Sequence, residues 1–192
     1  MSSYGDNTYI VFLELPEDIA HKIDMIRGKY SNTNFPYQAH ITLKQDEDYL
    51  IDAEKFADII TEELQAQEPI LLEINKISSR AGSAGWNIYL PVKARAISYL
   101  VRRLSRAVQN YIDPKSPKAM QSTEWEQSKD FYAHISIKGF NNQALSEECL
   151  AKLKNEDFKI AFPIELNCNK LTIARWHDGQ WKAIRTIKLG SK

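Results

Sequence analysis

The sequence predicts an α+β fold of two duplicated βαβαβ-type lobes, with largely antiparallel sheets related by a pseudo-two-fold axis. Strand and helix patterns alternate along the 192 residues in the order β-α-β-α-β and then β-α-β-α-β-β. A short motif recurs in the second strand of each half, and the small-residue stretch 79–85 indicates a lobe junction or a hairpin turn. We therefore expect a single domain over residues 1–192, with lobes at about 8–80 and 86–190 and an active-site cleft between them.

Five elements are predicted in the first half. β-branched and aromatic residues indicate the opening strand. Pro16 followed by Glu17 and Asp18 is typical of a helix start, because carboxylates are stabilised at the positive end of the helix dipole. Apolar side chains at helical spacing indicate both helices. The elements are a strand at about 8–15, a helix to about 29, a strand at about 38–44, a helix at about 52–67 and a strand at about 70–78.

Six elements and a long loop are predicted in the second half. Ser146 is the expected cap of the second helix, and Asp178-Gly179 between strand patterns indicates a hairpin. Prolines and charges make 113–130 a loop, either a lid or specificity element or a disordered segment. The elements are a strand at 86–92, a helix at 96–112, a strand at about 132–139, a helix at about 146–155, a strand at about 158–176 that is interrupted near Pro163, and a strand at 181–189.

Composition and charge exclude several classes of protein. The formal net charge is zero, which argues against a non-specific nucleic-acid binder, since such a protein needs a basic face. The two cysteines, Cys149 and Cys168, match neither a zinc pattern nor a disulfide scaffold. No run of about 18 apolar residues suggests a membrane span. The polar N-terminus lacks a signal-peptide core, so we expect a cytoplasmic location and no membrane partner.

The two copies of the motif carry the chemistry of the chain. They read His40-Ile41-Thr42-Leu43 and His134-Ile135-Ser136-Ile137. Alternate residues of a strand point to opposite faces. In each copy the apolar residues can therefore enter a core, while the histidine and the hydroxyl residue share the other face. Two such rows at one site would supply a general base, a general acid and hydrogen-bond donors to an anion.

Strand parity extends this polar face to further candidate binding residues. Lys44 and Lys138 follow the two motifs, share the parity of the histidines, and could offset charge on an anion; alternatively they lie at solvent-exposed strand ends. Tyr132 and Gln38, two residues before each histidine, are candidates to shape the pocket, although Tyr132 could be an ordinary cross-strand aromatic residue. Tyr89 points away from the core face of its own strand and is a further candidate.

The paired motifs resemble those of the 2H phosphoesterase superfamily, which includes the 2′-5′ RNA ligase-like and cyclic phosphodiesterase proteins. That superfamily carries two copies of His-apolar-[Ser/Thr]-apolar in a duplicated α+β fold, and both tetrapeptides match residue by residue. The resemblance also covers Leu15-Pro16 and the closing hairpin from Leu171 to Leu189. One departure is Gly139, where the RNA ligase branch often has arginine, so the resemblance to that branch is weaker.

The resemblance implies a metal-independent phosphoesterase that acts on a 2′,3′-cyclic phosphate or a 2′-5′ linkage of a nucleotide or RNA end. One of His40 and His134 would act as general base and the other as general acid, while Thr42 and Ser136 would hold the non-bridging oxygens. No cofactor or metal is expected, and the protein should be a monomer. The sequence leaves open the substrate and the assignment of base and acid.

Two alternatives remain. The chain could be a non-catalytic nucleotide or RNA-end binding module that keeps the same cleft, although intact histidine and hydroxyl residues in both halves argue against it. A metal site using both histidines is the weaker alternative, because no carboxylate or thiol occurs at ligand spacing.

Overall fold

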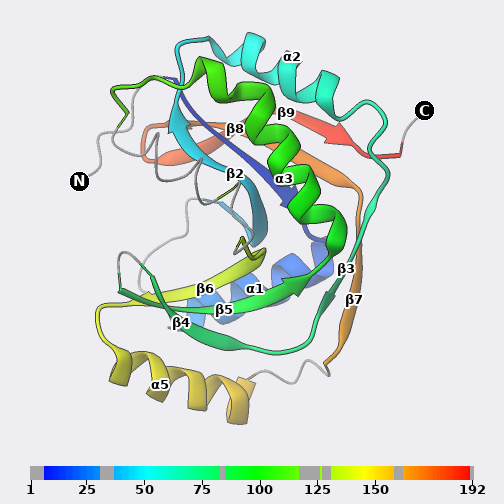
Figure 1. The fold of residues 1–192 in the computed structure, drawn as a ribbon. Coiled ribbons are helices and arrows are strands. Elements are labelled where there is room, and N and C mark those ends of the chain that lie inside the picture. The colour runs from blue at the N-terminus through cyan, green and yellow to red at the C-terminus, as the bar shows by residue number, and fades with distance from the viewer. Residues whose placement is uncertain are drawn as a thin grey trace.

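The computed structural model describes residues 7–30, 37–82, 85–116, 126, 131–157 and 162–190 (Figure 1). Its strands are β1 (Thr8–Glu14), β2 (His40–Asp48), β3 (Ile70–Ile74), β4 (Ser78–Gly82), β5 (Gly85–Lys93), β6 (His134–Phe140), β7 (Ile164–Cys168), β8 (Lys170–His177) and β9 (Gln180–Lys188). Its α-helices are α1 (Glu17–Tyr30), α2 (Ala53–Glu63), α3 (Arg95–Val108) and α5 (Gln143–Lys152). A 3₁₀ turn, Gln109–Tyr111, follows α3, and a π-helical turn, Leu153–Asp157, follows α5.

The strands form two antiparallel sheets. The first has the order β2-β1-β8-β9. The second has the order β4-β5-β3-β7, with β6 paired to β5. This confirms the predicted α+β class with antiparallel sheets. The strands that carry the two motifs, β2 and β6, come within 8 Å of each other between Cα atoms, although they belong to different sheets.

The predicted division into lobes at about 8–80 and 86–190 does not coincide with the two sheets. β3 and β4, from the first predicted lobe, join the second sheet, while β8 and β9, from the second, complete the first sheet. In Figure 1, β3 and β7 run side by side along one edge of the molecule and connect the two halves. The reason is that β8 pairs with β1, so the C-terminal hairpin extends the N-terminal sheet.

Helices cover the outer faces of both sheets. α2 and α3 lie on the first sheet and α5 on the second (Figure 1). A single apolar cluster runs through both halves and includes side chains from β1, β2, α2, α3, β5 and β6. Such a shared core favours one cooperative unit over two independent domains. Among the described helices, none is long and apolar enough to cross a membrane.

Local sequence signals locate most turns and helix ends. The predicted turns are confirmed, with β4 pairing to β5 as a hairpin and Asp178-Gly179, both at positive φ, joining β8 to β9. Gly85 has φ +122°, and a Cβ there would lie 2.3 Å from the Phe140 carbonyl oxygen, so only glycine fits.

One predicted helix start is wrong. α5 begins at Gln143, because the Asn142 side chain accepts a hydrogen bond from the Leu145 N–H at 3.0 Å. Ser146, the predicted cap, is instead a buried residue inside the helix. Most of the predicted loop 113–130 lies outside the described residues, and its role remains a prediction.

Candidate active site

The two motif histidines occupy equivalent positions in the fold. His40 is the first residue of β2 and His134 is the first residue of β6. Both rings are partly exposed. They are close enough for the charge of His134 to contribute to lowering the pKa of His40. The duplicated motif thus brings two imidazoles from different sheets to one place.

Each imidazole is oriented by a backbone carbonyl two residues earlier in the chain. The His40 Nδ1 atom lies 2.6 Å from the Gln38 carbonyl oxygen, and the His134 Nδ1 atom lies 3.4 Å from the Tyr132 carbonyl oxygen. A carbonyl oxygen only accepts, so each Nδ1 carries the proton and donates it. In the neutral ring the Nε2 atom is then the unprotonated one. Both histidines therefore keep Nε2 available for proton transfer.

Aromatic side chains surround both rings. The His40 ring centroid lies 4.6 Å from that of Phe12 and 6.1 Å from that of Tyr37. The His134 ring lies 5.1 Å from Tyr132 and 5.6 Å from Tyr89. These apolar surroundings disfavour the charged form of either imidazole.

Burial lowers the pKa of both histidines. For His40 the pKa falls to about 4, mainly through burial and then through the charge of Arg27, against the opposing effects of the Gln38 carbonyl and Asp24. Burial likewise lowers the pKa of His134, with a smaller contribution from Arg80, while the Tyr132 carbonyl raises it. Both rings are therefore neutral at pH 7 before an anion binds.

The hydroxyl residues share a face with these rings, as strand parity predicts. Thr42 pairs with Phe12, the residue whose ring lies against His40. Ser136 pairs with Tyr89, the residue whose ring lies against His134, and is exposed. Directly paired residues of neighbouring strands project to the same face. Each imidazole therefore has a hydroxyl on its own side of its sheet.

An equivalent β-bulge ends this parity in both motif strands. In β2, Thr42 pairs with Phe12 but Lys44 pairs with Val11, so Leu43 is the extra residue. In β6, Ser136 pairs with Tyr89 but Lys138 pairs with Ile88, so Ile137 is the extra residue. A bulge of this kind turns the residue that follows it, Lys44 or Lys138, to the face opposite the one that strict alternation predicts.

The prediction that Lys44 binds substrate is therefore contradicted. Its side chain is fully buried, and its Nζ atom binds the carboxylates of Glu47 and Glu126, the latter at 3.1 Å. Glu126 also accepts a hydrogen bond from the Gln45 N–H at 2.6 Å and one from the Ser105 hydroxyl. Burial raises the pKa of Glu126, partly offset by Lys44. Lys44 is thus the centre of a buried ionic cluster on the helix side of the sheet.

Lys138 is also turned away from the histidines. Its Nζ atom donates to the Tyr30 carbonyl oxygen at the end of α1, and it lies 5.3 Å from the Phe140 ring centroid. Its strand partner Ile88 is buried in the core, on the face opposite Tyr89 and Ser136. The structure therefore contradicts the expectation that Lys138 faces the anion.

Two side chains of α1 link the two motifs, a connection that no sequence pattern indicated. The Arg27 Nε atom donates to the Ser136 carbonyl oxygen at 2.9 Å, and its Nη1 atom donates to Asp24 at 2.9 Å. The other Asp24 oxygen accepts from the Ala39 N–H at 3.1 Å, next to His40. Arg27 is 3% exposed. We call Asp24 and Arg27 the α1 bridge.

Of the other predicted binding residues, Tyr132 and Tyr89 lie beside His134, whereas Gln38 lies beside His40. Tyr132 and Tyr89 lie against His134 and against each other, with ring centroids 5.6 Å apart. The Gln38 carbonyl orients His40, while residue Gln38 lines two cavities of about 480 and 670 Å³ that also contain several carboxylates. Those cavities are poorly suited to a phosphate because like charges repel.

Arg80 is a further residue near the site that sequence patterns did not single out. Its guanidinium carbon lies 4.5 Å from the Tyr132 ring centroid, and its charge acts on His134. No signal distinguished it, because its strand β4 adjoins a hairpin far from either motif in the sequence. Within the described ranges, no three His, Cys, Asp or Glu side chains form a group that could hold a metal ion.

Comparison with known proteins supports one family. A family model described as the 2′-5′ RNA ligase superfamily matches residues 15–180. TT0787 of Thermus thermophilus is similar in structure, with a TM-score of 0.65 and 13% identity over 95% of this chain and 97% of that one. A structure described as a phosphoesterase has a TM-score of 0.58 and 15% identity over 96% and 99%. At these identities the likeness shows the fold alone.

Escherichia coli LigT in complex with 3′-AMP is also similar, with a TM-score of 0.57 and 14% identity over 96% of this chain and 98% of LigT. Further structures of LigT with NADP⁺ and with ATP match as well. None of the curated protein sequences matches the chain.

Proposed function

Because the chain belongs to the 2′-5′ RNA ligase superfamily, we propose that it is a metal-independent phosphoesterase that opens a 2′,3′-cyclic phosphate, or cleaves a 2′-5′ linkage, at a nucleotide or RNA end. The observation that carries the proposal is the equivalent placement of His40 and His134. Each begins an edge strand, each donates through Nδ1 to a carbonyl, and each keeps Nε2 for a proton.

In this proposal the two imidazoles act as a general acid and a general base. One neutral ring accepts a proton from the attacking water as its oxygen bonds to phosphorus. The other, protonated, gives a proton to the ribose oxygen as its bond to phosphorus breaks. The product is a phosphomonoester with a free neighbouring hydroxyl. General acid–base catalysis of this type contributes about 10²–10⁴ in rate.

The hydroxyls of Thr42 and Ser136 are proposed to donate hydrogen bonds to the non-bridging oxygens of the phosphate. Their positions on the faces of His40 and His134 support this role. Donors placed where negative charge develops stabilise the transition state. The bound anion also favours an imidazolium and raises the pKa of the acid.

A nucleotide as substrate is supported by the relatives and by aromatic side chains near the site. LigT is described in complexes with 3′-AMP, NADP⁺ and ATP. In this chain Tyr132 and Tyr89 beside His134 are the proposed contacts to the nucleoside. A monomeric state and a cytoplasmic location remain predictions, which size-exclusion chromatography and cell fractionation test.

The experiment incubates the protein in EDTA with nucleoside 2′,3′-cyclic phosphates and follows the product by phosphorus NMR. We expect turnover, with a single regioisomer of the monophosphate, and a loss of about 10²–10⁴ in rate for His40→Ala and for His134→Ala. His177→Ala, at an exposed histidine on the β8–β9 hairpin, is the matched control. Full activity in both active-site variants would refute acid–base catalysis by this pair, and binding without turnover would identify a non-catalytic module.

A further inference from the structure

Arg80 is a cation beside His134 that has no ionic partner within the described part of the chain. Its side chain is exposed, and its guanidinium lies on the Tyr132 ring at 4.5 Å. Tyr132 in turn lies 5.1 Å from His134. The two lysines expected near the anion are bound elsewhere, Lys44 by carboxylates and Lys138 by the Tyr30 carbonyl. Of these three cations in the described part of the chain, Arg80 is therefore the one available to meet an anionic ligand on this side of the site.

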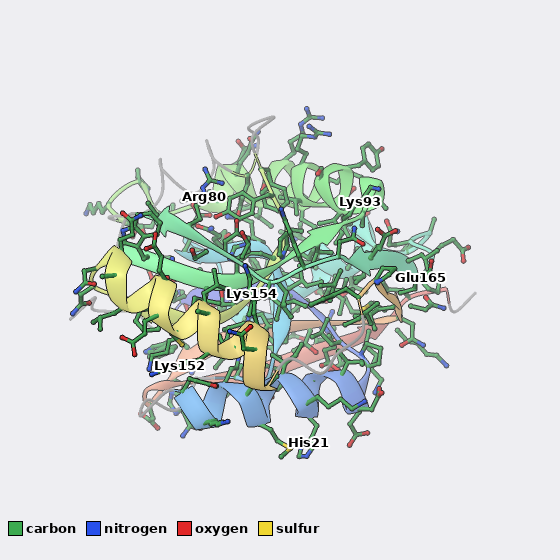
Figure 2. All side chains as sticks on the ribbon, turned by 90° about the horizontal axis from the view of Figure 1, so that it is seen from below. His21, Arg80, Lys93, Lys152, Lys154 and Glu165 are labelled. Atoms are coloured by element: carbon green, nitrogen blue, oxygen red, sulfur yellow. The ribbon has the colours of Figure 1, made fainter. Side chains whose placement is uncertain are left out.

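The register of the second sheet places Arg80 on the face of the active-site residues. Arg80 pairs with Asn87, and Asn87 pairs with Gly139. Asn87 and Tyr89 are two residues apart on β5 and so share a face, and Tyr89 pairs with Ser136. Arg80 consequently projects to the same side as the Ser136 hydroxyl. Figure 2 shows it well separated from Lys152 of α5 and from Lys154 of the π-helical turn that follows α5. That helix covers the outer side of this sheet (Figure 1).

The position of β4 separates the backbone of Arg80 from the reacting phosphate. The phosphorus must lie within reach of both histidines, where β2 and β6 approach each other. β4 is two strands beyond β6, across β5, and that corresponds to about 10 Å. The backbone of Arg80 thus lies on the side of β6 away from β2, while its guanidinium reaches over the Tyr132 ring next to His134. A group bound by the guanidinium lies next to the reacting phosphate, on the Tyr132 side of His134.

We propose that Arg80, held on the Tyr132 ring, binds a second phosphate of the substrate, so that the protein prefers a cyclic phosphate at the end of an oligonucleotide to a cyclic mononucleotide. This inference rests on the proposed function and specifies its substrate class. A guanidinium stacked on an aromatic ring is preorganised, and its planar fork suits two phosphate oxygens. No side chain of this subsite takes part in proton transfer, so it determines which substrate binds and leaves the reaction type unchanged.

The test compares two substrates in wild-type protein and in Arg80→Gln. The first is adenosine 2′,3′-cyclic phosphate, and the second is the dinucleotide ApA ending in the same cyclic phosphate, which adds one internucleotide phosphate. The measured quantity is the ratio of kcat/KM for the dinucleotide to that for the mononucleotide. We expect this ratio to fall by about 10- to 100-fold in Arg80→Gln, as for the loss of hydrogen bonds to a charged group. Arg106→Gln, at an exposed arginine of α3, should keep the wild-type ratio.

A ratio that is unchanged in Arg80→Gln, or that equals one in the wild-type protein, would overturn the proposal. Calorimetric binding of adenosine 3′-phosphate and of ApA ending in a 3′-phosphate makes the same comparison without turnover. A protein that binds the dinucleotide more tightly through Arg80 but hydrolyses neither substrate would contradict the proposed catalysis and still support this subsite. A protein that hydrolyses the substrates, but whose ratio does not change in Arg80→Gln, would support the proposed catalysis and contradict this subsite.

Discussion

At the scale of single residues, the alternation of side chains along a strand correctly predicted that each histidine shares a face with the hydroxyl residue two positions later. The same alternation gave the wrong face for the lysine two positions further on. Thr42 and Ser136 lie on the faces of His40 and His134 because the strands are regular up to that point. The side chains of Lys44 and Lys138 point to the opposite face, because each strand has a bulge at the fourth residue of its motif. No residue type in the tetrapeptides indicates a bulge, because Leu43 and Ile137 are ordinary β-sheet residues. The face of a strand residue can thus be predicted from alternation in the sequence only up to the first bulge, where the pairing changes register.

The lowered pKa values of the two histidines lead to a kinetic prediction. The proposed reaction needs one imidazolium, but in the free protein burial lowers the pKa of His40 to about 4 and also lowers that of His134. We therefore expect kcat/KM to be highest below pH 6.5 and to fall as pH rises, because the acid loses its proton. A bound phosphate raises the pKa of the acid, so the alkaline limb of kcat should lie at higher pH. Initial rates from pH 4 to 9 measure both profiles, and coinciding alkaline limbs would contradict the account.

The same pKa shift affects folding. Since the pKa of His40 is lower in the folded protein than its ordinary 6.5, the unfolded chain binds more protons between these values. The contribution of His40 to stability is thus complete above pH 6.5 and is lost as pH falls toward 4. Between pH 6.5 and about 4, the free energy of unfolding should therefore fall less in His40→Asn than in the wild type. Urea unfolding at several pH values measures this difference. An unchanged pH dependence in the variant would count against a buried neutral His40.

At the scale of elements, the bulge in β2 creates the buried cluster around Lys44. Removing the lysine would leave Glu47 and Glu126 as uncompensated buried charges. We expect Lys44→Met to lower the free energy of unfolding by about 3–5 kcal/mol. Lys152→Met, which breaks an exposed Lys–Glu pair on α5, should cost no more than about 1 kcal/mol. Urea denaturation measures both values.

Activity separates this structural role from substrate binding. Folded Lys44→Met protein, assayed below its unfolding transition, should keep kcat/KM within about tenfold of wild type, since Lys44 does not reach the site. A stable variant that loses about 100-fold in kcat/KM would instead indicate that Lys44 contacts the phosphate.

The α1 bridge, formed by Asp24 and Arg27, is the second structural feature that positions the two motifs. Asp24 accepts from the Ala39 N–H beside His40 and holds Arg27, which binds the Ser136 carbonyl. Misplacing a catalytic group by about 1 Å can cost about 10² in rate. We therefore expect Asp24→Asn to lower kcat by about 10- to 100-fold with little change in KM.

A second readout of the α1 bridge is electrostatic. Asp24 raises the pKa of His40, so Asp24→Asn should lower that pKa further, as followed by NMR titration of the ring. Asp18→Asn, at an exposed aspartate of the same helix, is the matched control for both measurements. Wild-type kcat together with an unshifted His40 titration in Asp24→Asn would refute a positioning role.

At the scale of the whole molecule, the sequence predicted the fold class, the order of the described α-helices and the approach of the two motif strands. It did not separate β7 from β8, and it placed a turn over most of β4. It did not predict which strands share a sheet. The exchange of β3 and β4 with β8 and β9 between the halves depends on pairing between segments that are distant in sequence, as between Tyr9 and Arg175 or between Ile70 and Cys168. The α1 bridge and Arg80 were missed for a similar reason, because each acts on a motif that is distant in sequence. Local patterns report local structure, while the site is assembled by tertiary contacts.

In the proposed function His40 and His134, supplied by two different sheets, work as one catalytic pair. Groups that act as a unit have strongly non-additive effects on rate. The decisive measurement is single-turnover hydrolysis of a nucleoside 2′,3′-cyclic phosphate in EDTA by wild type, His40→Ala, His134→Ala and the double variant. We expect the double variant to be about as slow as the slower single variant. A double variant whose loss equals the product of the two single losses would show that the histidines act independently and would contradict the account.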